Sequence, residues 1–148
     1  MADDFEALAA SIHRVFPRSR IEPATEEQLA ANRRDYPDAP AHYTEFLRRV
    51  GWGSLGGGNF MIYNGLVGPA EVFDAATAAE LAGVALLGDD FSGWMVGFDT
   101  RAGWRLVGVD NGSAPEPLAQ RTLAEFIAQR IADAQDAEPR AAPDLGGM

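Results

Sequence analysis

The stretch WMVGFDTRAGWRLVGV, residues 94–109, contains two apolar runs separated by the five-residue segment 99–103. Five residues are a usual length for the link of a β-hairpin. The runs 94–98 and 104–109 are therefore predicted to pair as antiparallel strands. Large apolar residues fall on both sides of each predicted strand, which indicates a sheet that is covered on both of its faces.

Upstream of this hairpin, glycine-punctuated short apolar runs begin after Gly51. Such runs are typical of strands joined by tight turns. A weaker helical pattern covers 69–81, between two of the runs. The predicted strands are 59–63, which ends in an Asn64-Gly65 turn, then 66–67 and 84–87.

Helical patterns flank the strand region on both sides. Pro17 ends the first helix, and the pairs Thr25/Gln28 and Thr122/Glu125 have the form of capping boxes that begin two others. The predicted helices cover 5–16, 25–35, 40–50 and a segment that starts at Thr122. This order predicts an α+β fold with a central, largely antiparallel sheet flanked by helices.

The chain of 148 residues is long enough for one domain, which we predict over residues 1–134. Residues 135–148 replace large apolar residues with proline, alanine, glycine and acids, so they are predicted to form a disordered tail. The acidic start of the chain does not resemble a secretory signal, and the most apolar window, 75–87, is too short to span a membrane. These features predict a cytoplasmic protein.

Composition excludes several enzyme classes. The chain has no cysteine, and arginine supplies all 12 basic residues, so thiol catalysis, zinc-thiolate sites and lysine chemistry are excluded. The glycines 51, 53 and 56 match the dinucleotide-binding pattern, but a helix precedes them and a strand follows, which is the wrong order. We therefore predict no catalytic residues, no cofactor and no metal. An enzyme that uses carboxylates alone stays open as a less favoured alternative.

The charge of the chain is concentrated in its middle third. The net charge is −10, and residues 51–100 contain six acids and no arginine. Such a balance disfavours nucleic acid as a direct partner and favours a basic protein. The alternative is that these acids only solubilise turns. The candidate partner contacts are Glu71, Asp74, Asp89, Asp90 and Asp99, with Trp52 as an exposed aromatic anchor in a glycine-rich loop.

Several stretches between Phe5 and Ile131 resemble the SUKH superfamily, including its Smi/Knr branch. The first is a proline-led helix, residues 40–47, that runs into Gly51. The others are Leu86-Leu87-Gly88-Asp89 with Gly93, the strand Leu106-Val107-Gly108-Val109-Asp110, and Thr122-Leu123-Ala124-Glu125-Phe126-Ile127.

This resemblance implies an α+β domain without catalytic residues. Many bacterial members are similar to immunity proteins, which bind and block a toxin domain, often a nuclease. A toxin that acts on nucleic acid tends to present a basic cleft, and this fits the acidic charge of the chain. Fungal members resemble regulatory scaffolds, so a non-catalytic regulatory or scaffolding module is the alternative function. The toxin and the oligomeric state stay open.

Overall fold

The computed structural model describes residues 2–146, and it confirms the predicted α+β domain. Seven strands form one antiparallel sheet in which each strand pairs with the next along the chain. The strands are β1 (Arg20–Glu22), β2 (Trp52–Leu55), β3 (Phe60–Val67), β4 (Val84–Asp89), β5 (Trp94–Asp99), β6 (Arg105–Asp110) and β7 (Glu116–Pro117). The predicted hairpin is the β5–β6 pair, which lies next to β4 and β7 in this sheet.

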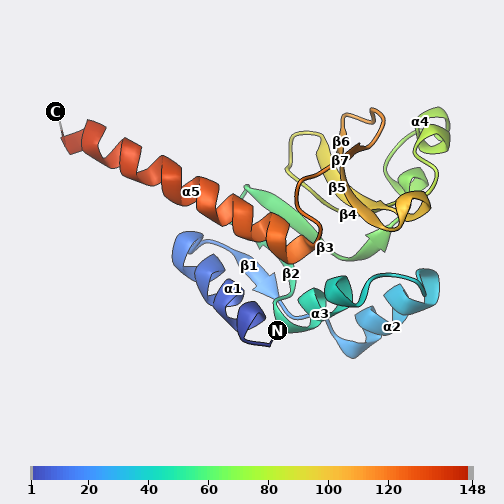
Figure 1. The fold of residues 1–148 in the computed structure, drawn as a ribbon, viewed down its shortest axis with the longest axis horizontal. Helices are drawn as coiled ribbons and strands as arrows, with labels where there is room; N and C mark the ends of the chain where they lie inside the picture. The colour runs from blue at the N-terminus through green and yellow to red at the C-terminus, as the bar shows by residue number, and fades with distance from the viewer. Residues whose placement is uncertain (1, 147–148) are drawn as a thin grey trace.

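Five α-helices flank the sheet. They are α1 (Ala2–Val15), α2 (Glu26–Asp35), α3 (Ala41–Arg49), α4 (Ala75–Glu80) and α5 (Leu123–Gly146), and two short 3-10 helices are η1 (Pro69–Glu71) and η2 (Thr100–Ala102). Figure 1 shows α1, α2 and α3 along one side of the molecule and α4 at the opposite side. None of the helices in this described part of the chain combines the length and the apolarity that crossing a membrane requires.

The main core lies between one face of the sheet and α1, α3 and α5. Tyr43, Phe46, Phe60 and Phe98 are fully buried there. The Tyr43 and Phe98 rings meet edge to face, with their centroids 5.5 Å apart. Burial of side chains this large supplies most of the hydrophobic stabilisation of a domain of this size.

A second, smaller core lies on the outer face of the sheet, the face turned away from α1, α3 and α5. Its buried residues come from β4, β5 and β6 and from Leu81, which follows α4, and Phe73 packs against them from the segment between η1 and α4. The sheet is therefore covered on both faces in its central strands, as the sequence predicts. The η1–α4 segment covers only part of the outer face.

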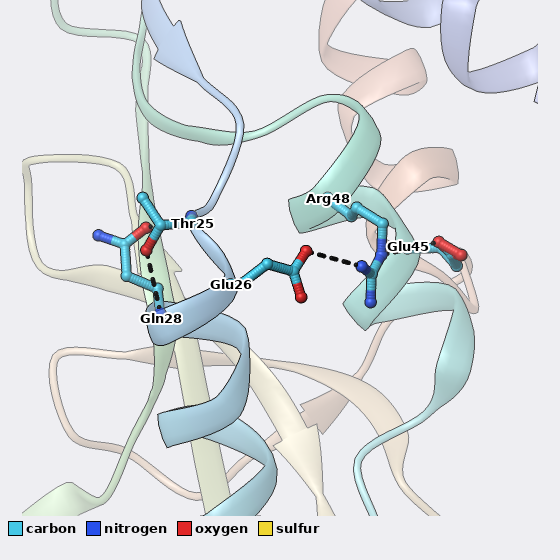
Figure 2. Close-up of polar contacts among 5 residues, drawn as sticks. All are labelled: Thr25, Glu26, Gln28, Glu45 and Arg48. Carbon is cyan, nitrogen blue, oxygen red and sulfur yellow. Dashed lines mark hydrogen bonds and ion pairs between the residues drawn. The ribbon is translucent and has the colours of Figure 1, made fainter.

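Side-chain caps fix where α2 begins. The Thr25 hydroxyl accepts a hydrogen bond from the Gln28 backbone N–H at 3.1 Å, and the Gln28 side chain accepts one from the Thr25 N–H at 2.9 Å. Arg48 of α3 forms an ion pair with Glu26 at 3.0 Å, and this pair joins α3 to α2 (Figure 2). Arg48 also lies beside Glu45 of its own helix. The predicted capping box is confirmed.

The Asn64-Gly65 pair does not form the predicted turn, because β3 continues through it. The register of β3 against β4 shifts between Ile62 and Val67, and this irregularity leaves the ladder incomplete. The Asn32 side chain of α2, only 5% exposed, accepts a hydrogen bond from the Leu66 N–H at 2.9 Å. A tertiary contact thus replaces the missing partner, and the strand continues.

Replacing Asn32 with alanine is expected to lower the free energy of unfolding by about 1–3 kcal/mol, because the Leu66 N–H would stay buried without a partner. Urea denaturation followed by circular dichroism measures the change. Asn64→Ala is the matched control, since Asn64 is exposed on the same strand, and its effect should stay within about 0.5 kcal/mol. Equal effects of the two substitutions would contradict the role of Asn32.

The C-terminal helix extends beyond the body of the domain. Among the residues of α5 whose burial is described, 123–136, Ile131 is the last buried one, and the helix then projects away from the sheet (Figure 1). The sequence predicts a disordered tail over 135–148, whereas the backbone is helical as far as Gly146. Residues 147 and 148 lie outside the described residues.

Candidate functional site

A hollow of about 420 Å³ opens on the outer face of the sheet, beside the η1–α4 segment. Its base comes from neighbouring strands, because Asp89 of β4 is the cross-strand partner of Met95 of β5. Directly paired residues point to the same face of a sheet. The hollow is lined by Tyr63, Val72, Phe73, Asp89, Phe91, Gly93, Met95 and Asn111.

Two apolar side chains border this hollow and face solvent. Phe91 is 55% exposed and Val72 is 46% exposed, and they are the two exposed large apolar residues within the described part of the chain. They come from different segments, since Phe91 lies in the β4–β5 turn and Val72 follows η1. Exposed apolar residues that gather at one place mark an interaction site more often than scattered ones do.

A half-buried carboxylate lies among these apolar side chains. Asp89 accepts a hydrogen bond from the Tyr63 hydroxyl at 2.6 Å and another from the Phe91 N–H at 2.8 Å. Burial, followed by the hydrogen bond to Asp89 and the charge of Asp89, raises the pKa of Tyr63, so its hydroxyl stays protonated and keeps donating. Among the described residues, Asp89 forms no ion pair.

The β4–β5 turn holds Phe91 in a strained conformation. Its φ is +68°, a left-handed value that large side chains rarely adopt. The Asp90 carboxylate accepts hydrogen bonds from the Ser92 N–H at 2.8 Å and the Trp94 N–H at 3.1 Å, which ties the turn together. Strain of this kind concentrates at functional sites, where the surrounding structure over-determines the conformation.

The structure separates the predicted acidic contacts. Asp90 lies next to Asp89 in sequence, but its charge acts on Arg130 of α5, where burial lowers the pKa of the guanidinium and Asp90 opposes that shift. Asp99 lies at the other end of the β4–β5 pair, where its side chain accepts a hydrogen bond from the Arg101 N–H at 3.0 Å. Of these three acids, only Asp89 lines the hollow.

Glu71 and Asp74 flank the lining residues Val72 and Phe73 along the chain, and both are exposed. Glu71 accepts a hydrogen bond from the Gly68 N–H at 3.0 Å. Asp74 caps α4 and accepts a hydrogen bond from the Thr77 N–H at 2.8 Å, and this bond lowers the pKa of its carboxyl. Both acids therefore stabilise local structure beside the hollow.

Trp52 is not the exposed aromatic that the sequence predicts. It begins β2, is half-buried and packs against the main core, and its indole N–H is buried without a hydrogen-bond partner among the described residues. Of the glycines on either side of Trp52, Gly53 belongs to β2 and pairs with Ile21 of β1 and Ile62 of β3, and Gly51 immediately precedes the strand. A role for Trp52 in partner binding stays a prediction.

Phe91, the exposed aromatic of this surface, is not among the residues selected from the sequence. A usable signal exists in Asp89-Asp90-Phe91-Ser92-Gly93, where a large apolar residue interrupts residues that favour turns. A phenylalanine inside a tight turn cannot reach the core easily. Val72 and Tyr63 carry no comparable signal, since both lie in segments where burial is expected.

A second hollow, of about 400 Å³, lies between α1, α3 and α5 and is lined by Phe5, Leu8, His42, Thr122, Ala124, Glu125 and Ala128. The Nδ1 atom of His42 is buried there without a hydrogen-bond partner in the described chain. Burial lowers the pKa of His42, and the charge of Glu125 opposes this shift. His42 is consequently neutral at pH 7 and offers no cation to a ligand.

The lowered pKa of His42 predicts a loss of stability in acid. The unfolded chain binds a proton to this imidazole more tightly than the folded chain does, so stability falls as the pH drops below about 6.5 and levels off below the folded-state pKa. We expect His42→Gln to show a shallower fall between pH 7.5 and pH 5 in thermal unfolding. His13→Gln, at an exposed position of α1, is the control and should retain the wild-type profile. Identical profiles for wild type and His42→Gln would contradict the prediction.

The outer-face hollow offers recognition chemistry, namely one carboxylate, one phenol and apolar walls. Within residues whose positions are described, no group of three or more acidic or histidine side chains is arranged to hold a metal ion. No protein-family model, curated protein or solved structure matches this chain.

Proposed function

We propose that this chain is a cytoplasmic, non-enzymatic immunity protein of the SUKH type that binds a cognate toxin domain and occludes its active site. The observation that carries the proposal is the outer-face hollow, where Phe91 and Val72 are exposed beside the Asp89 carboxylate. Exposed aromatic anchors surrounded by charge are the usual centre of a protein interface.

Charge supports a basic partner. Asp89, Asp74 and Glu71 lie in or beside the hollow, and residues 51–100 contain no arginine that could neutralise them. Complementary potential speeds the encounter of two proteins and selects among partners. An interface of about 800 Å² on each side is sufficient to cover a catalytic cleft.

The direct test is capture of partners by the immobilised full-length chain from a lysate of the organism that encodes it, followed by elution with rising salt and mass spectrometry. A basic toxin domain that elutes at moderate to high salt supports the proposal. Recovery of only signalling or cell-envelope proteins would overturn it in favour of a regulatory or scaffolding module.

Charge reversal then maps the surface. With the captured toxin domain, Asp89→Arg combined with Asp90→Arg is expected to slow association and to flatten its dependence on salt, because reversing these charges removes part of the potential that attracts a basic partner. Stopped-flow mixing over a salt series measures this. Asp99→Arg reverses one charge at the far end of β5, and it should affect the rate by less than half as much as the double variant, which reverses two. Equal rates for all variants would remove this turn from the binding surface.

A further inference from the structure

We propose that the outer-face hollow receives an arginine side chain of the partner protein, with its guanidinium on the Asp89 carboxylate and its aliphatic stem between Phe91 and Val72. This inference rests on the proposed function and specifies what the site recognises. It would hold for any basic protein surface, since it depends on one side chain rather than on a particular toxin.

The carboxylate of Asp89 is prepared for a fork-shaped donor. Its Oδ2 atom accepts from the Tyr63 hydroxyl and its Oδ1 atom accepts from the Phe91 N–H. Each carboxylate oxygen has two acceptor positions, so one position on each oxygen stays available. A guanidinium can donate two parallel hydrogen bonds to such a pair, and this geometry adds both energy and specificity.

The apolar walls favour arginine over lysine. Phe91, Phe73 and Val72 line the hollow, and Met95 lies on the same strand face as Asp89. A guanidinium is planar and weakly hydrated, and it stacks on aromatic rings, whereas an ammonium keeps its water more strongly. The long aliphatic stem of arginine also covers apolar surface while the charged end reaches the acid.

Two arginines near the β4–β5 pair have their contacts elsewhere than at Asp89. Arg101 packs against Gly83 at the opposite end of the β4–β5 pair. Arg130 donates to the Asn59 side chain at 2.7 Å and lies over the Phe60 ring in the main core. The cation that complements Asp89 therefore comes from a partner.

The test is a titration of the full-length, ¹⁵N-labelled chain with the blocked peptide acetyl-Ala-Arg-Ala-amide, followed by NMR. We expect weak binding, with a dissociation constant of about 1 mM, and shifts confined to the amides of residues 89–93, Tyr63 and Asn111. The same peptide with citrulline, which keeps the shape and removes the charge, should bind at least about tenfold more weakly. A lysine peptide should fall between the two.

Matched variants localise the effect. Asp89→Asn keeps an acceptor for the Phe91 N–H and removes the charge, and it should weaken arginine binding at least about tenfold. Asp99→Asn makes the same change away from the hollow and should leave binding unchanged. Shifts outside the hollow, equal binding of the citrulline or lysine peptide, or full binding by a folded Asp89→Asn variant would each overturn the inference.

Failure here is distinguishable from failure of the proposed function. A basic toxin domain captured equally by wild type and Asp89→Asn would support neutralisation through an acidic surface and refute the arginine pocket. Peptide binding confined to the hollow, together with capture of only scaffold-type partners, would support the pocket and overturn the immunity function.

Discussion

Replacing Phe60 with alanine is expected to lower the free energy of unfolding by about 3–5 kcal/mol. Phe60 begins β3, is fully buried, and its ring centroid lies 5.0 Å from that of Phe126 in α5. A Cβ atom added at Gly88 of β4 would lie only 2.7 Å from this ring, so the sheet leaves space there for the aromatic side chain. Removing the ring opens a cavity that rigid strands cannot close.

The loss should be visible in urea denaturation as a lower midpoint with little change in slope. A domain of this size has a total stability of about 5–15 kcal/mol, so the variant would be partly unfolded at 37 °C in the lower part of that range. Phe91→Ala is the matched control, because it deletes the same ring from an exposed site. Similar losses for the two variants would contradict the assignment of Phe60 to the core.

Strong local signals explain how much of the fold could be predicted. The β5–β6 hairpin, the capping box of α2 and the proline before α3 each fix a backbone conformation within a few residues. Such signals need no knowledge of distant contacts. They were sufficient for the α+β class and the antiparallel sheet.

The elements that the sequence did not reveal depend on distant partners. β1 has three residues and β7 has two, and each lies at an edge of the sheet with one neighbouring strand. In the sequence, residues 52–55 have the composition of a glycine-rich loop. In the structure they form β2, where Gly53 has a φ of +131° and pairs with Ile21 of β1 and Ile62 of β3. Pairing of this kind is decided by register across the sheet, which composition does not encode.

The sequence predicted the acidic character of the candidate site, but it did not predict the shape of the site. The arginine-free segment 51–100 indicated Asp89, but it also indicated acids such as Asp99 that lie away from the hollow in the structure. A hollow forms only where η1 and α4 leave part of the outer sheet face uncovered, and this depends on tertiary packing. The exposure of Phe91 follows from the same packing, so the sequence could not rank it above the buried phenylalanines.

Replacing Phe91 with glycine is expected to leave the free energy of unfolding unchanged or raise it by up to about 1 kcal/mol, while it weakens partner binding by at least about 30-fold. Glycine adopts a φ of +68° without strain, which stabilises the folded state of the variant. Glycine also raises the conformational entropy of the unfolded chain, and this opposes the stabilisation. Loss of an aromatic anchor at the centre of an interface typically costs about 2 kcal/mol or more of binding energy, which gives the fold-change.

Urea denaturation and titration calorimetry with the captured partner measure the two quantities separately. Phe91→Asn is the second variant, because asparagine also tolerates the left-handed conformation and removes the ring. A drop in stability for both variants would mean that Phe91 serves the fold, and unchanged binding would mean that it does not serve the site. Stability that is unchanged or raised, together with weaker binding, is the result expected of a residue that serves recognition and not the fold.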